Sequence, residues 1–312
     1  MKRVTALIGL VEGAGDDVLR AFVDYFNMLF LIDLNVFALA LVECERRRDD
    51  VRVVFEAVGD LDAAVAVASF RAGRSAWCRP VILTKGSGLG ITAFAHPLLR
   101  DARTNEIDLP SRRGIVITGS NMSGKTTLLR ALGVNVILAQ TIHTCVASRF
   151  VCPPLVVRTA IALSDSLLDG KSYYLTEATT VLSMVGADET VQHLFLLDEM
   201  FRGTNTEERI AAGVAVMGSL VANGNMAVVA THDADVVHFT RDTYDAQHFA
   251  ESVTPAGLAF DFVLRPGQAT GRNAISLLAA LGAPDALLFR ASQICAELEN
   301  GEAIDAAEPA SC

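Results

Sequence analysis

Gly119-Ser120-Asn121-Met122-Ser123-Gly124-Lys125-Thr126 fits the pattern G-x-x-x-x-G-K-[ST] of a phosphate-binding loop. An apolar β-branched run at 114–118 precedes this segment and indicates a buried parallel strand, while the residues at 127–140 have the pattern of a helix. Strand, loop and helix N-terminus together favour an anion, because backbone N–H groups and the helix dipole both point at it. The sequence therefore predicts a nucleotide-phosphate site. The alternative, a chance match in a glycine-containing turn, requires both flanks to be coincidental.

Two residues of this loop have distinct predicted roles. Lys125 would reach the β- and γ-phosphates, and the hydroxyl of Thr126 would hold Mg²⁺. We expect the whole segment and the adjacent Thr127 to contact ATP.

Composition narrows the class of protein. The chain has 312 residues, of which 51% are hydrophobic and 20% charged, with a net charge of −10. This acidic average argues against a protein that coats nucleic acid by charge alone. The six cysteines form no C-x-x-C pair, so reduced thiols and a cytoplasmic location are expected. The apolar window at 21–42 carries Asp24 and Asp33, which argues against a membrane span, and the short apolar run at 6–11 argues against a signal peptide.

The chain changes character near residue 85. Helical periodicity at 16–48 and 51–71 predicts a small helical domain over 1–85, and glycines at 86, 88 and 90 indicate a boundary loop. An α/β alternation then predicts a mostly parallel sheet with helices on both faces over 86–299, and a disordered tail at 300–312. Expected strands lie at 81–84, 91–94, 114–118, 159–163, 194–197, 226–230 and 258–264. Expected helices lie at 127–140, 177–185, 206–222 and 286–298.

Two further motifs follow expected strands. Leu194 to Leu197 would deliver Asp198 and Glu199 at the C-terminal edge of the sheet, where ligands bind in such folds. Asp198 would complete the Mg²⁺ shell, and Glu199 would orient and deprotonate the attacking water. His232 follows the strand at 226–230, where it can hydrogen-bond a γ-phosphate; a structural histidine is the alternative.

These motifs, taken in order, resemble the MutS family of DNA mismatch repair ATPases. The Asn121-Met122 pair inside the phosphate loop is a hallmark of that family. The other matches are His96-Pro97-Leu98-Leu99, the signature-like segment 165–178, the acidic motif and turn 198–206, Ala230-Thr231-His232 and 271–275. The resemblance covers about residues 50–300.

The resemblance implies a P-loop NTPase of the ABC-like superfamily that hydrolyses ATP with Mg²⁺ and forms a homodimer with composite sites. Ser172 of one subunit would cap the γ-phosphate bound by the other; a loop hydroxyl is the alternative. Adenine contacts would come from 105–107, including Ile107, although the family's stacking aromatic residue is missing from that segment. DNA is the implied partner, with ATP driving closure of the dimer.

The sequence also departs from the family. No Phe-x-Glu wedge for mismatch reading occurs before residue 85, and Phe249-Ala250-Glu251 lies inside the ATPase half, where we interpret it as chance. Two other functions stay open at this point. A transport or chromosome-organising ABC ATPase should carry an L-S-G-G-Q-like signature, which is absent. A non-enzymatic nucleotide-gated binding module should have lost catalytic residues, yet Lys125, Glu199 and His232 are present.

Overall fold

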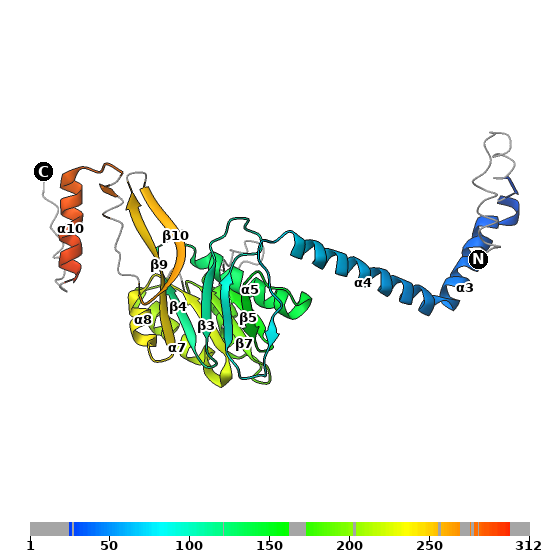
Figure 1. Ribbon diagram of the computed structural model, residues 1–312, viewed down its shortest axis with the longest axis horizontal. Coiled ribbons are helices and arrows are strands. Elements are labelled where there is room, and N and C mark those ends of the chain that lie inside the picture. Colours follow the sequence, from blue (N-terminus) through cyan, green and yellow to red (C-terminus); the bar gives the residue numbers. More distant parts are fainter. Residues whose placement is uncertain are drawn as a thin grey trace. The chain divides into compact units, whose positions relative to one another are not determined.

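The computed structural model describes residues 25–299 except 27, 121, 162–172, 202–203, 255–256, 269–274, 276–277 and 280. The chain divides into two compact units, Met1–Gly73 and Arg74–Cys312, whose elements Figure 1 labels in chain order. The predicted domain border at residue 85 stays a prediction. The predicted tail at 300–312 lies outside the described residues.

The described part of the first unit includes the helices α3 (Ile32–Arg46) and α4 (Arg48–Ala72), which meet at Arg47. Acidic residues in the first turn of α4 and Arg71 in its last turn suit the helix dipole. Neither helix contains a buried residue. These helices agree with the helical periodicity of the sequence, although the first predicted helix starts before the described residues.

The second unit is built on a six-stranded sheet with the order β10-β9-β4-β8-β7-β6. Every neighbouring pair is parallel except β9 and β10, which form an antiparallel hairpin beside β4 (Figure 1). The strands are β4 (Gly114–Thr118), β6 (Val156–Ala160), β7 (His193–Asp198), β8 (Met226–Ala230), β9 (Tyr244–Thr254) and β10 (Gly257–Pro266). The predicted α/β fold with a mostly parallel sheet is confirmed.

Alternating side chains on the central strand β4 enter two different cores. Ile115 and Ile117 pack with α5 (Lys125–Ile142) on one face of the sheet. Val116 faces the other core, which is built with α6 (Tyr173–Val185), α7 (Thr206–Leu220) and α8 (Ala234–Thr240). A strand buried on both faces explains the uninterrupted apolar run before the phosphate loop.

A second sheet covers the other side of α5. Its order is β1-β5-β2-β3, and its strands are β1 (Val81–Ile82), β2 (Leu89–Phe94), β3 (Asn105–Leu109) and β5 (Arg149–Cys152). Apolar side chains of β2, β3 and β5 share one core with α5 and β4. Helix α5 therefore lies between two sheets, which explains why nine of its residues are buried.

Buried Asn135 ties α5 to this second sheet. Its side-chain amide donates to the carbonyl oxygen of Ala95 (3.0 Å), and its Oδ1 accepts from the backbone N–H of Val146 (2.8 Å). A buried amide with these bonds is satisfied and fixes the segment before His96 against the helix that starts the phosphate site.

Several predicted element bounds were wrong. The strand expected at 159–163 is β6, three residues earlier, where Val156 pairs in register with His193. The sequence analysis missed β3, β5, α8 and β9, because they are short or mix polar and apolar residues. The last predicted helix matches α10 (Asp285–Glu299). Among the described residues, no helix is long and apolar enough to cross a membrane.

Candidate nucleotide site

The phosphate loop joins β4 to α5 in the way the sequence predicts. Gly119 (φ 145°) and Gly124 (φ 107°) adopt backbone conformations that favour glycine. A Cβ atom at Gly119 would also lie 2.9 Å from Ser123 Oγ. The buried Ser123 hydroxyl has no hydrogen-bond partner within the described part of the chain. An unsatisfied hydroxyl at a helix N-terminus suits a loop that receives a phosphate oxygen.

Lys125 is buried beneath this loop. Its Nζ donates to the carbonyl oxygens of Gly119 (2.7 Å) and Ser120 (2.8 Å), and only 5% of the residue is exposed. Glu199 Oε1 lies 4.0 Å from the same nitrogen. These carbonyls keep the ammonium group satisfied inside the loop, so its charge is available where phosphates would sit.

The acidic motif lies directly against the loop. Thr126 Oγ1 donates to Asp198 Oδ2 at 2.5 Å, although the two residues are 72 positions apart. A hydroxyl and a carboxylate oxygen are hard ligands of the type that Mg²⁺ prefers, usually together with substrate phosphates. Thr126 and Asp198 therefore fit the predicted Mg²⁺ site.

Glu199 follows β7 in a tight turn. Its backbone is left-handed (φ 53°), and its N–H donates to the carbonyl oxygen of Ala230 in β8 (2.9 Å). The side chain is 9% exposed, with Oε2 3.6 Å from His232 Nδ1. The turn thus places a buried carboxylate between Lys125 and His232.

His232 is the exposed member of this group. About half of its side chain (54%) is exposed, and its Nε2 lies 3.8 Å from Asp233 Oδ1. Asp233 in turn receives two hydrogen bonds from Arg209 of α7, each 3.0 Å long. The sequence analysis missed Arg209, because only the fold brings α7 beside the residue that follows His232.

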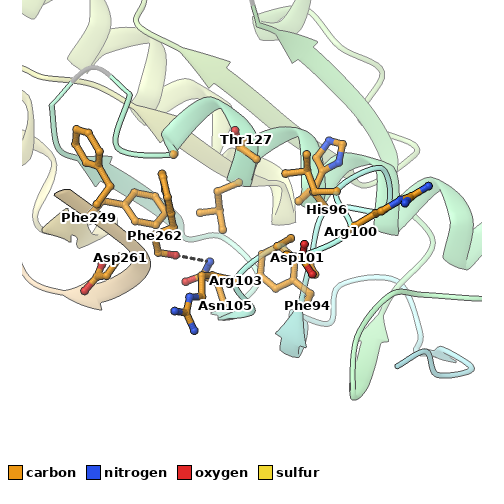
Figure 2. A pocket seen from close by; sticks show the side chains of 17 residues that line it. Phe94, His96, Arg100, Asp101, Arg103, Asn105, Thr127, Phe249, Asp261 and Phe262 are labelled. Atoms are coloured by element: carbon orange, nitrogen blue, oxygen red, sulfur yellow. Dashed lines mark hydrogen bonds between the residues drawn. The ribbon is translucent and has the colours of Figure 1, made fainter. Parts of the chain in front are cut away.

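A cavity of about 650 Å³ opens beside the phosphate loop. Figure 2 shows aromatic side chains from both directions: Phe94 from β2 on one side, and Phe249 and Phe262 from the β9–β10 hairpin on the other. The ring of Phe262 lies 3.2 Å from where a Cβ of Gly124 would be, so the cavity begins at the loop itself. An aromatic, mostly apolar cavity of this size suits a flat heterocycle.

Polar groups complete the cavity wall. Asn105 Nδ2 donates to the carbonyl oxygen of Phe262 (3.1 Å), and its Oδ1 accepts from the N–H of Leu264 (2.7 Å), which joins β3 to β10. Arg100 and Arg103 also line the cavity (Figure 2). Burial, followed by the charge of Arg130, lowers the pKa of the His96 imidazole, so this lining residue is neutral at neutral pH.

The predicted base contact at Ile107 receives no support from its side chain. Ile107 is 2% exposed and belongs to the core around α5, whereas Asn105 of the same strand lines the cavity. No aromatic residue occurs at 105–107, but Phe262, far along the chain, lines the cavity. Alternating aromatic residues at Phe260 and Phe262 were the signal, although only the hairpin brings them to the loop.

Of the remaining predicted residues, two lie outside the described part of the chain and two lie inside it. Asn121 and Ser172 are outside the described residues. Met122 is 84% exposed, and Thr127 lines the cavity. Glu251 of β9 belongs to the Phe249-Ala250-Glu251 string that we interpreted as chance, and its carboxylate accepts a hydrogen bond from the Ser120 hydroxyl.

A family model described as MutS domain V matches residues 115–299, which contain the phosphate loop, the acidic pair and His232. The chain belongs to the MutS family. The DNA mismatch repair protein MutS of Natronomonas pharaonis is 30% identical over 260 residues, 80% of this chain and 30% of that protein. DNA mismatch repair protein MutS 2 of Halobacterium salinarum is 33% identical over 249 residues, 75% of this chain and 28% of that protein. The chain thus spans less than a third of the length of these MutS relatives.

Proposed function

We propose that this chain binds ATP with Mg²⁺ and hydrolyses it to ADP and phosphate. The observation that carries the proposal is the meeting of Lys125, Thr126 and Glu199 at one edge of the sheet, with Asp198 2.5 Å from Thr126. Membership of the MutS family supports the same activity, since its domain V is a P-loop ATPase domain. We further propose residues 86–299 as the ATPase domain.

The nucleotide would lie across the two halves of the site. Its phosphates would receive hydrogen bonds from the N–H groups of the loop and from Lys125, which would exchange the carbonyls of Gly119 and Ser120 for phosphate oxygens. Its base would enter the cavity and stack on Phe262, whose ring borders the loop. This arrangement replaces the predicted base contact at Ile107 by Phe262 and Asn105.

Hydrolysis requires an oriented water molecule. Glu199 would take one proton from this water as its oxygen attacks the γ-phosphorus, and the bond from that phosphorus to the bridging oxygen of ADP would break. His232, 3.6 Å from Glu199, would hold the carboxylate and reach the γ-phosphate. Mg²⁺ held by Thr126 and Asp198 would neutralise charge on the phosphates.

The finer parts of the proposal concern assembly. As in the sequence expectation, we propose a homodimer in which Ser172 acts in trans, with ATP-driven closure coupled to DNA binding. Both curated relatives named above are DNA mismatch repair proteins, which supports DNA as a partner. No mismatch-reading wedge is assigned within this chain, so branched and mismatched DNA are both candidates.

A phosphate-release assay tests the proposed activity. Wild-type protein with Mg²⁺ and ATP should release phosphate continuously, and Lys125→Ala should lose ATP binding and turnover together. Truncating one member of a buried charge pair costs about 2–5 kcal/mol, so we expect an ATP Kd at least about 30-fold higher. Lys85→Ala is the matched control, because that lysine bonds the carbonyl of Glu189 instead. A flat wild-type trace would refute hydrolysis and favour a nucleotide-gated binding module.

The assembly is tested separately by sedimentation with ATP. The hydrolysis-deficient Glu199→Gln protein should dimerise when ATP is bound, and a monomer with bound ATP would exclude the composite site.

Binding to homoduplex, mismatched and branched DNA over a salt series tests whether DNA is a partner. DNA contacts predict affinity that falls as salt rises, and a chain with no measurable affinity for any of the three has no DNA partner.

A further inference from the structure

A carboxylate that the proposed reaction does not use lies buried behind the catalytic turn. Glu177 is in the second turn of α6, and only 3% of the residue is exposed. Its Oε1 accepts a hydrogen bond from the backbone N–H of Phe201 at 2.7 Å. Burying a carboxylate costs free energy unless the group is hydrogen-bonded, because it loses its hydration. Packing alone would therefore favour an apolar side chain at this position.

The residue that Glu177 holds belongs to the turn that presents Glu199. Glu199 (φ 53°) and Phe201 (φ 59°) both have left-handed backbone conformations, which residues other than glycine rarely adopt. Each such residue costs about 1–3 kcal/mol and persists only when the surroundings fix it. The turn therefore depends on contacts that hold it in this conformation.

The following contacts between described residues act in this way. The N–H of Glu199 bonds to Ala230 of β8, which fixes the start of the turn. The ring of Phe201 is buried in the core that contains Val181 of α6. The Glu177 carboxylate binds the N–H of Phe201, which fixes the end of the turn. Of these, the hydrogen bond that the Glu177 carboxylate accepts can be removed by substituting Glu177, which leaves the other two in place.

We infer that Glu177 is a positioning residue for ATP hydrolysis, whose buried carboxylate holds the turn that aims Glu199 at the attacking water. The inference rests on the proposed function. Without this hydrogen bond the turn can relax, and Glu199 leaves the place between Lys125 and His232 (4.0 and 3.6 Å). The phosphate loop is on a different segment, so ATP binding should survive the change.

Steady-state phosphate release by the full chain, together with direct ATP binding, tests this inference. We expect Glu177→Ala to lower kcat about 10- to 100-fold, because displacing a catalytic group by about 1 Å has effects of this size. KM and the ATP Kd should stay near the wild-type values. Glu177→Gln keeps a carbonyl oxygen that can accept from Phe201, so its kcat should return to within about threefold of wild type.

Leu155→Ala is the matched control for a purely structural effect. Leu155 is 6% exposed and packs in the core around α5, which does not contain Phe201. Its truncation should lower the melting temperature and leave kcat near wild type. In the Glu199→Gln background, Glu177→Ala should have little further effect on turnover, because the two residues act as one unit.

Each outcome decides the matter. A Glu177→Ala protein with wild-type kcat overturns the inference. A Leu155→Ala protein that loses as much kcat as Glu177→Ala, or a Glu177→Gln protein as impaired as Glu177→Ala, also overturns it. If Glu177→Ala does not fold, Glu177→Asp decides, since it retracts the carboxylate by one methylene: reduced kcat with intact ATP binding supports the inference, and unchanged kcat overturns it. A wild-type protein without phosphate release refutes the proposed function itself, whereas an active wild type with an unaffected Glu177→Ala refutes only this inference.

Discussion

The phosphate end and the base end of the site are encoded in different ways. At the phosphate end, Lys125, Asp198 and His232 each follow a buried strand of one parallel sheet, so their order along the chain and their place in space correspond. At the base end, the cavity is lined by residues of the β2–β3 connection and of the β9–β10 hairpin. In the proposed site, the phosphate contacts therefore lie in local motifs, whereas the cavity proposed for the base forms only through tertiary packing.

The largest effect that separates the two ends is expected from Phe262→Ala. Base–aromatic stacking is worth about 1–3 kcal/mol, so the Kd for ATP should rise about 5- to 150-fold. Binding of inorganic triphosphate should not change, because it uses only the phosphate end. Isothermal titration calorimetry with both ligands measures this. Phe239→Ala, which truncates an exposed phenylalanine of α8, is the control. Equal losses for ATP and triphosphate would show that Phe262 shapes the loop instead.

A smaller effect is expected at the exposed side of the phosphate end. His232→Ala removes the contact to Glu199 (3.6 Å), and a partly exposed pair of this kind contributes about 0.2–1 kcal/mol, so kcat should fall about fivefold at most. If His232 acts in the hydrolysis step, the Kd for ATP should stay unchanged. Phosphate-release kinetics measured beside ATP binding distinguish this role from a structural one, in which melting temperature falls and kcat does not.

The smallest effect concerns the sheet that carries the base end. Burial raises the pKa of the Cys152 thiol in β5 to about 11 from 9.0. A thiol with a raised folded-state pKa contributes stability that is complete below pH 9 and lost as the pH rises toward 11. Thermal melts over this range should show a steeper loss for wild type than for Cys152→Ala. Cys44→Ser, at an exposed position, should follow wild type; parallel curves for all three proteins would contradict the assignment.

The sequence was sufficient for the parts of the fold that repeat a simple pattern. Strands β4, β7 and β8 are short, are built on apolar runs and lead into a polar motif, and each was predicted at its place. Motif order also predicted that Thr126 and Asp198 serve one site, and the two side chains lie 2.5 Å apart, while their Mg²⁺ role stays a prediction. Hydrophobic periodicity and motif order can be recognised from the sequence alone, because they depend on residues that are close together along the chain.

The rest of the site depends on long-range contacts that no local pattern reports. Asn105 reaches Phe262 across 157 residues, and Arg209 meets Asp233 only because α7 packs beside the strand end. The family resemblance implied a base contact at Ile107, yet the side chain of Ile107 is buried in the core around α5. Glu177 could not be assigned to the turn of Glu199 without the fold, since 24 residues separate it from Phe201.

The measurement that tests the central claim most directly is ATP binding and turnover by Glu199→Gln. Glutamine keeps the size of the side chain and removes the base, so the Kd for ATP should match wild type while kcat falls about 10²–10⁴-fold, the usual contribution of general-base catalysis. That result would place the chemistry at the turn after β7, at the phosphate end of one shared nucleotide site. A variant that keeps wild-type turnover would contradict the account, because the reaction would then proceed without the buried carboxylate between Lys125 and His232.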